Sequence, residues 1–95
     1  MKVNPENLTV AHNPEEQRFE IRVASYLAEL RYLIKGDTIT FTHTGVPTAL
    51  EGQGLGSRLA RSGLEYAREH GLKVKAHCSF VAAYLERHPE YQDLT

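Results

Sequence analysis

Tryptophan is absent from this chain of 95 residues, and cysteine and methionine occur once each. A single cysteine excludes an intramolecular disulfide and is typical of a reducing compartment. No apolar run approaches the length of about 20 residues that a membrane-spanning helix needs, and the N-terminus lacks the apolar core of a signal peptide. We therefore expect a cytoplasmic protein that does not enter a membrane.

Neither sign of charge is in excess, since 11 lysines and arginines face 12 aspartates and glutamates, for a formal net charge of −1. Neutralising phosphates takes a basic surface, so nucleic acid is not an expected partner. Hydrophobic residues make up 41% and charged residues 24% of the chain, as in ordinary globular proteins. We predict one domain over residues 1–95, as a monomer or a weak dimer.

The first half of the chain predicts an antiparallel meander of four strands: Leu8–Ala11, Arg18–Val23, Tyr26–Ile34 and Thr38–His43. The second and fourth segments alternate polar and apolar residues, the period of a half-buried strand. The third also suits a helix, and we assign it to a strand because a Lys35–Asp37 turn follows it.

The second half changes to a helical period. Apolar residues recur from Leu55 onward on one face of a helix, which Gly71 ends. Lys73–Cys78 alternates again as a strand, and Phe80–Arg87 predicts a short helix that Pro89 halts. The order β-β-β-β-α-β-α defines a mixed α/β (α+β) domain with a mainly antiparallel sheet and two helices.

A glycine-rich segment precedes the longer helix: Gly52, Gln53, Gly54, Leu55, Gly56 and Ser57. The start of a helix has unpaired backbone N–H groups and a partial positive charge, which attract an anion. Glycine tolerates a positive φ and lets a phosphate approach the main chain. We interpret the segment as a cradle for a diphosphate.

Two nucleotide-binding motifs compete for such a loop, and neither fits. A P-loop needs Lys-Ser or Lys-Thr after its glycines, and none follows here. The dinucleotide fingerprint G-x-G-x-x-G belongs to the first strand–helix junction, whereas G-x-G-x-G lies halfway along this chain. A structural turn before a helix would account for two of the three glycines.

The segment resembles the [QR]-x-x-G-x-[GA] motif of the GNAT superfamily of N-acetyltransferases. Gly54 and Gly56 match its two small positions, and Glu51 stands where glutamine or arginine is usual. Three further stretches look like the small single-domain YjdJ-like branch: His43–Pro47, Cys78–Tyr84 and His88–Tyr91. The resemblance covers roughly residues 8 to 93, nearly the whole chain.

The resemblance implies a minimal GNAT acyl-coenzyme A N-acyltransferase fold that binds acetyl-coenzyme A as co-substrate and moves acetyl to a primary amine by direct attack. A turn replaces the two helices that usually wall the acceptor site, so the acceptor side should be open to a protein amine or a polyamine. The alternatives are a non-catalytic acyl-coenzyme A binding module and a plain interaction domain. The residues expected to hold the cofactor are Val46, Gly52, Gln53, Gly54, Leu55, Gly56 and Ser57.

Gly45 and Pro47 predict that strand pairing fails around Val46, through a bulge at the glycine and a missing donor at the proline. The resemblance implies that pantetheine inserts there and that the Val46 N–H faces the thioester carbonyl. It also places Tyr84 beside the sulfur, as a hydrogen-bond donor to the leaving thiolate. The alternative is an amphipathic core tyrosine.

Cys78 and His43 are the other candidates for chemistry. Cys78, predicted at the end of the fifth strand, is either a small buried hydrophobe or a group that accepts the acyl transiently. His43, on the predicted face of Ile39 and Phe41, is either a satisfied core residue or a proton relay through water. Relatives often carry an acidic residue at the position of Gly45, and this chain does not.

Glu51 should turn outward, because a carboxylate aimed at a bound diphosphate would repel it. Arg58 and Arg61 on the first helical turns either offset this charge or are ordinary surface arginines. None of the five histidines has a metal-ligand spacing with carboxylates or with Cys78, so no metal is expected.

Overall fold

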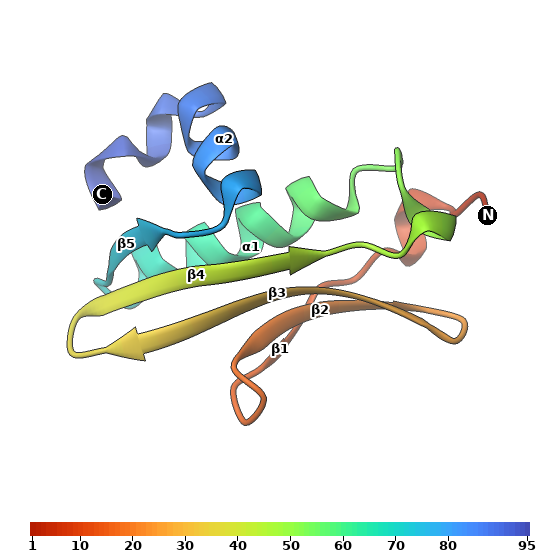
Figure 1. Ribbon diagram of the computed structural model, residues 1–95, viewed down its shortest axis with the longest axis horizontal. Helices are drawn as coiled ribbons and strands as arrows, with labels where there is room; N and C mark the ends of the chain where they lie inside the picture. The colour runs from red at the N-terminus through yellow and green to blue at the C-terminus, as the bar shows by residue number, and fades with distance from the viewer.

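The computed structural model describes all of residues 1–95. Five strands and two α-helices follow one another in the order β-β-β-β-α-β-α (Figure 1), which confirms the predicted order and fold class. The strands are β1 (Ala11–Asn13), β2 (Arg18–Val23), β3 (Tyr26–Lys35), β4 (Thr38–Gly45) and β5 (Lys73–Ala76). The helices are α1 (Leu55–Glu69) and α2 (Ser79–Arg87), with 3-10 helices η1 (Pro5–Asn7), η2 (Thr48–Leu50) and η3 (Pro89–Leu94).

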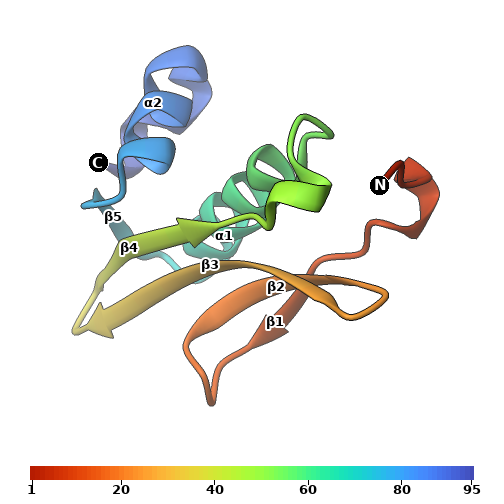
Figure 2. The same ribbon diagram turned by 45° about the vertical axis from the view of Figure 1, so that its right-hand side comes forward.

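The strands form one sheet in the order β1-β2-β3-β4-β5, antiparallel except for the parallel pair β4 and β5. Both α-helices lie on the same side of the sheet, and the opposite face carries no helix (Figure 2). A short turn joins β1 to β2, so no helix separates the first two strands.

Helix α1 packs closely on the sheet because Gly63 faces it. A Cβ on Gly63 would lie 2.7 Å from a ring carbon of Phe41 and 3.1 Å from a methyl of Leu30. Phe41 and Leu30 are fully buried there, with Leu59 and Leu64 of α1. The apolar stripe of α1 thereby forms the centre of a core cluster of 21 residues, which fixes the start of α1 relative to β4.

Several predicted boundaries differ from the structure, most clearly those of β1 and β5. β1 begins at Ala11, because Leu8 ends the preceding 3-10 turn, where its N–H donates to Pro5, and its side chain is buried. β5 ends at Ala76 rather than at Cys78, since the chain turns there into α2. Pro89 does follow the end of α2, but it begins a further 3-10 helix.

A bulge in β4 lies at Thr42, three residues before the predicted position at Gly45. Tyr32 pairs with Phe41, yet the adjacent Arg31 pairs with His43, so Thr42 is an extra residue. The alternation of faces inverts beyond it. The prediction that His43 shares the face of Phe41 is therefore wrong, and His43 lies exposed on the helix-free face.

His12 joins β1 to the core through an aromatic cluster. Its ring stacks on Phe19 at 4.4 Å between centroids, and its Nε2 lies 2.6 Å from the Tyr32 hydroxyl. Burial, and next the charge of His70, lower the pKa of His12 below its ordinary value. The neutral ring is thus the form that the fold stabilises.

The free energy of unfolding is therefore expected to fall as the pH drops below about 6.5, because the unfolded chain then binds a proton at His12 that the folded chain resists. Urea unfolding measured between mildly acidic and neutral pH checks this. The exposed His77 offers a matched control. His12→Gln should remove part of the pH dependence and His77→Gln should not; equal slopes in the two variants would contradict the assignment.

Candidate functional site

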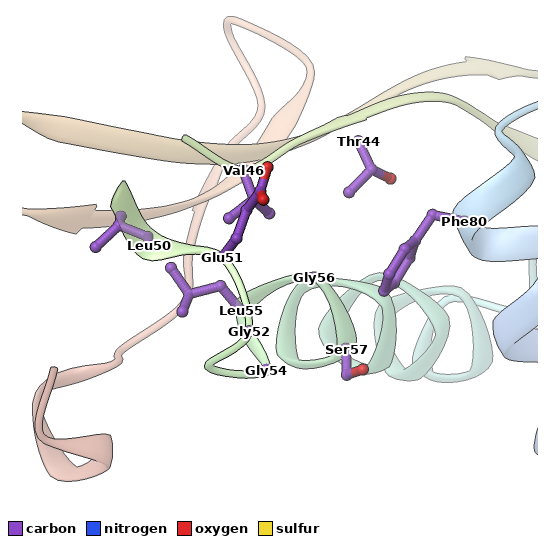
Figure 3. A pocket seen from close by; sticks show the side chains of 10 residues that line it. All are labelled: Thr44, Val46, Leu50, Glu51, Gly52, Gly54, Leu55, Gly56, Ser57 and Phe80. Carbon is purple, nitrogen blue, oxygen red and sulfur yellow. The ribbon is translucent and has the colours of Figure 1, made fainter. Parts of the chain in front are cut away.

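A cavity of about 460 Å³ opens between the end of β4, the loop that follows η2, and the starts of α1 and α2 (Figure 3). It is the larger of two in the protein. Its walls are Thr44, Val46, Leu50, Glu51, Gly52, Gly54, Leu55, Gly56, Ser57 and Phe80. Six of the seven residues expected to hold a cofactor thus come together here, and Gln53 is the exception.

The backbone of this loop presents a row of unused donors. None of the N–H groups of Gly52–Ser57 donates a hydrogen bond within the protein, and the first helical bond of α1 runs from Arg58 N to Gly54 O at 3.1 Å. No side chain caps the helix, and its first turn holds no acidic residue. Such donors at a helix N-terminus favour an anion.

The fold requires glycine at these loop positions for two different reasons. Gly52 and Gly54 adopt left-handed φ angles of +78° and +81°, and a Cβ on either would meet nothing within 4 Å. Their requirement is conformational. Gly56 instead makes room for a side chain, because its Cβ would lie 2.7 Å from Phe80 Cζ. The wall of the cavity thereby joins α1 directly to α2.

Strands β4 and β5 separate beside the cavity. Their pairing ends at Phe41 and Ala76, and the Phe41 carbonyl then accepts from both His77 N, at 3.0 Å, and Cys78 N, at 3.1 Å. His43–Gly45 pair only with β3, and the bulged Thr42 has no partner. The Val46 N–H, next in the chain, makes no hydrogen bond within the protein. The predicted loss of strand pairing is therefore present, and the Val46 N–H is a free donor at the point where β4 and β5 have separated.

Cys78 lies directly behind the cavity wall, at the N-cap of α2. Its Sγ is 3.0 Å from Oγ1 of Thr44, and Thr44 itself lines the cavity. Burial opposes ionisation of the thiol, but the Thr44 hydroxyl and the nearby backbone N–H groups of Val81, Phe80 and Thr44 outweigh it and lower the pKa of Cys78. A thiolate at a helix start is the nucleophilic form of cysteine.

Replacing Thr44 with valine keeps the shape and removes the hydroxyl. We expect the pKa of Cys78 to rise, and the rate of Cys78 alkylation by iodoacetamide near neutral pH to fall by several-fold, because less thiolate is present. The pH profile of alkylation measures this. The exposed Thr42 on the neighbouring bulge is the control: an equal loss in Thr42→Val would contradict the role of the Thr44 hydroxyl.

Tyr84 is not brought to the cavity. Its ring is buried, stacked on His88 at 3.9 Å between centroids. Burial is the main reason that the pKa of its hydroxyl is raised. Phe80, one turn earlier on α2, fills the wall instead. His43 also stays outside the cavity, on the helix-free face behind Gly45.

Two loop side chains behave differently from expectation. Glu51 lines the cavity, and its carboxylate extends toward Val46 (Figure 3), so the expectation that it turns outward is wrong. Gln53 faces the N-terminal segment, where its Oε1 accepts from Val3 N at 2.7 Å and its Nε2 donates to Met1 O. Its side chain thus holds the loop rather than lining the cavity. Arg58 and Arg61 are exposed on α1 and form no ion pair.

Two residues of the cavity wall were not anticipated, Leu50 and Phe80, whereas Thr44 belongs to the segment His43–Val46 along which pantetheine was expected. The bulge turns Thr44 toward the cavity, and no feature of the sequence marks that inversion. Phe80 lies in the wall because its ring packs where Gly56 of α1 lacks a side chain, a contact between two helices that no local pattern predicts.

No three His, Cys, Asp or Glu side chains lie close enough to share a metal ion. No helix has both the length and the apolar character required to cross a bilayer.

Comparison with known proteins identifies the class to which this fold and cavity belong. The family described as GCN5-related N-acetyl-transferase matches residues 18–94. The solution structure of a GCN5-like protein from Staphylococcus aureus is similar to this one, with a TM-score of 0.73 and 38% sequence identity over 93% of this chain and 87% of that one.

Two curated relatives are Protein NATD1 of Xenopus tropicalis and of Homo sapiens. The first is 28% identical over 86 residues, which are 87% of this chain and 79% of the relative. The second is 29% identical over 85 residues, 86% of this chain and 75% of the relative. The chain belongs to the GCN5-related N-acetyltransferase family, whose members use acetyl-coenzyme A as co-substrate.

Proposed function

We propose that this protein binds acetyl-coenzyme A and transfers its acetyl group to a primary amine. The observation that carries the proposal is the run of unused N–H groups at Gly52–Ser57, at the start of a helix and on the wall of a cavity. Unpaired donors of this kind suit the charge and the oxygens of a diphosphate. Family membership supplies the class of reaction.

The residues present fit the co-substrate. No Cβ stands over the backbone at Gly52 or Gly54, and no protein carboxylate caps α1. The diphosphate would lie on Gly52–Ser57, and the pantetheine would follow the unpaired edge of β4 toward Val46. The carboxylate of Glu51 stands on the Val46 side of the cavity (Figure 3), which leaves the helix N-terminus to the phosphates.

Acetyl-coenzyme A supplies a thioester, whose acyl carbon accepts the amine nitrogen while the thiol departs. The Val46 N–H, free of any partner in the protein, would donate to the carbonyl oxygen as negative charge develops on it. Cys78, behind Thr44, would offer a second route, in which its thiolate takes the acyl group as the thiol of coenzyme A departs and then loses the acyl group to the amine. His43 would accept a proton from an amine that approaches the helix-free face.

A non-catalytic acyl-coenzyme A binding module is the second candidate. The position of Tyr84 favours it, because the expected donor to the leaving sulfur does not line the cavity. This chain also has no acidic side chain at Gly45 that could serve as a general base. Binding without turnover would separate this candidate from the enzyme.

Calorimetric titration with acetyl-coenzyme A and with acetyl-pantetheine, which lacks the diphosphate, tests the proposal. We expect acetyl-coenzyme A to bind and acetyl-pantetheine to bind at least about 100-fold more weakly, through loss of several charge-assisted hydrogen bonds. Release of free thiol in the presence of primary amines then reports transfer. Equal affinity for the two ligands would contradict the diphosphate cradle.

A further inference from the structure

The helix-free face of the sheet is rich in charge, and most of it is positive. Six basic residues occupy outward positions of its strands: Arg18, Arg22, Arg31, Lys35, Lys73 and Lys75. Only Glu20 and Glu29 are acidic among the outward strand positions, although the whole chain has a net charge of −1. Further acids, such as Glu16 and Asp37, lie in the turns at its ends.

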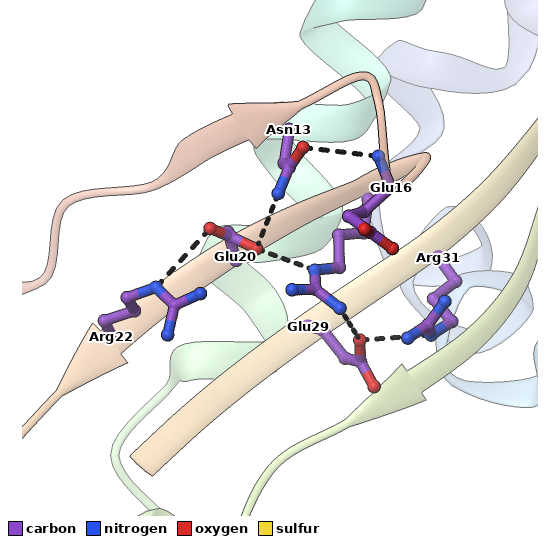
Figure 4. A network of polar contacts seen from close by, with 7 residues as sticks. Asn13, Glu16, Glu20, Arg22, Glu29 and Arg31 are labelled. Atoms are coloured by element: carbon purple, nitrogen blue, oxygen red, sulfur yellow. Dashed lines mark hydrogen bonds and ion pairs between the residues drawn. The ribbon is translucent and has the colours of Figure 1, made fainter. Parts of the chain in front are cut away.

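The arginines of this face are held in place by the two glutamates (Figure 4). Arg18 Nε donates to Glu20 Oε2 at 2.7 Å, and Arg22 Nε lies 3.6 Å from the other oxygen of Glu20. Arg31 Nε lies 3.1 Å from Glu29 Oε1, which Arg18 Nη1 approaches to 3.5 Å. Arg18 is therefore fixed by a hydrogen bond, whereas Arg22 and Arg31 are attracted to the same two carboxylates by charge.

These contacts leave many guanidinium donors unused. The terminal nitrogens of Arg31 and Arg22 make no hydrogen bond within the protein, and the two side chains are 43% and 65% exposed. A guanidinium fork matches a carboxylate with two parallel hydrogen bonds. The helix-free face thus presents two exposed guanidinium groups that can bind carboxylates of another molecule.

Arg31 lies next to the position proposed for transfer. Arg31 is the cross-strand partner of His43, and Glu29 is the partner of Gly45, the residue before Val46. A Cβ on Gly45 would lie 3.1 Å from His43 Nε2, so His43 leans over the backbone there. The Glu29 carboxylate would attract an approaching ammonium to Gly45, and the Arg31 cation beside it would oppose the charged form of that amine.

We propose that the helix-free face docks an acidic peptide segment, whose carboxylates bind Arg31 and Arg22 and whose amine reaches the sheet at Gly45. This inference rests on the proposed function, because the amine is an acetyl acceptor only if the protein is an acetyltransferase. It adds the class of acceptor. An extended peptide suits an open strand surface, along which the two arginines lie on adjacent strands. The acceptor is accordingly a protein amine with acidic neighbours.

Amide NMR titration of the whole protein with a short peptide tests the docking. The peptide has one lysine flanked by glutamates and a blocked N-terminus, and its control has glutamines in place of the glutamates. We expect shifts on β2 and β3 around Arg31 with the acidic peptide only, and weaker binding as salt is raised. Equal binding of the glutamine peptide, or equal shifts from free glutamate, would overturn the proposal.

Arg31→Ala is expected to raise the dissociation constant for the acidic peptide about tenfold. Arg31→Lys should also weaken binding, because lysine lacks the fork. The exposed Arg87 on α2 supplies a control of equal charge change. An effect of Arg87→Ala as large as that of Arg31→Ala would overturn the inference. A parallel titration with acetyl-coenzyme A separates the two proposals, since its failure would remove the proposed function while peptide binding can still be measured.

Discussion

Replacing Gly54 with glutamate is expected to weaken acetyl-coenzyme A binding at least about 100-fold, or about 3 kcal/mol. Two causes act together. Gly54 has φ +81°, which a residue with a side chain rarely adopts. The new carboxylate would also stand at the N-terminus of α1, where it competes with the diphosphate for the same N–H groups. Calorimetric titration measures the loss.

Gly71 provides the matched control. It also has a positive φ, +64°, and open space where its Cβ would stand, but it lies beyond the C-terminal end of α1. Gly71→Glu therefore imposes the same strain and the same charge without touching the cavity. We expect it to bind acetyl-coenzyme A as the native protein does. A similar loss in both variants would mean that strain, rather than the anion cradle, explains the effect.

Replacing Phe41 with alanine is expected to lower the free energy of unfolding by about 3–5 kcal/mol. Phe41 is fully buried, and its ring packs against the backbone of Gly63, where α1 meets the sheet. Truncation leaves a cavity that neither element can close. Since domains of this size are stable by only about 5–15 kcal/mol, urea unfolding should show a large shift of the midpoint.

Leu33 gives the comparison on the opposite face, because its side chain is 54% exposed. Leu33→Ala should change the unfolding free energy by less than about 1 kcal/mol. If Phe41→Ala lost no more than Leu33→Ala, the contact between Phe41 and Gly63 could not be the centre of the core. Phe41→Leu, which retains an apolar side chain, should fall between the two.

The elements of the fold were largely predictable, because each has a local signal. Alternation marked β2 and β4, the helical period marked α1, and Gly71 marked its end. The β3 segment was ambiguous, since its leucines suit either period, and pairing on both sides with β2 and β4 resolves it as a strand. A local pattern is sufficient where tertiary pairing agrees with it.

Alternation did not predict which face of the sheet the residues at the end of β4 occupy, where β4 separates from β5. One extra residue at Thr42 turns His43 outward and Thr44 inward, and nothing in the sequence distinguishes a bulge at Thr42 from one at Gly45. The hydrogen bond between Thr44 and Cys78 follows from that inversion. The loop Gly52–Ser57 could be proposed as a site from the sequence because its signal is chemical, in the glycines and the helix that follows. The Phe80 wall depends on how α1 and α2 pack, a tertiary contact with no local signature.

Titrating acetyl-coenzyme A into the labelled protein while following its backbone amides by NMR tests the central claim most directly. The account predicts shifts centred on Gly52–Ser57 and on Val46, whose N–H groups are free in the structure. In the same titration of the Gly54→Glu variant, the resonances of these amides should not shift. No shifts at millimolar acetyl-coenzyme A, or shifts confined to residues away from the cavity, would contradict it.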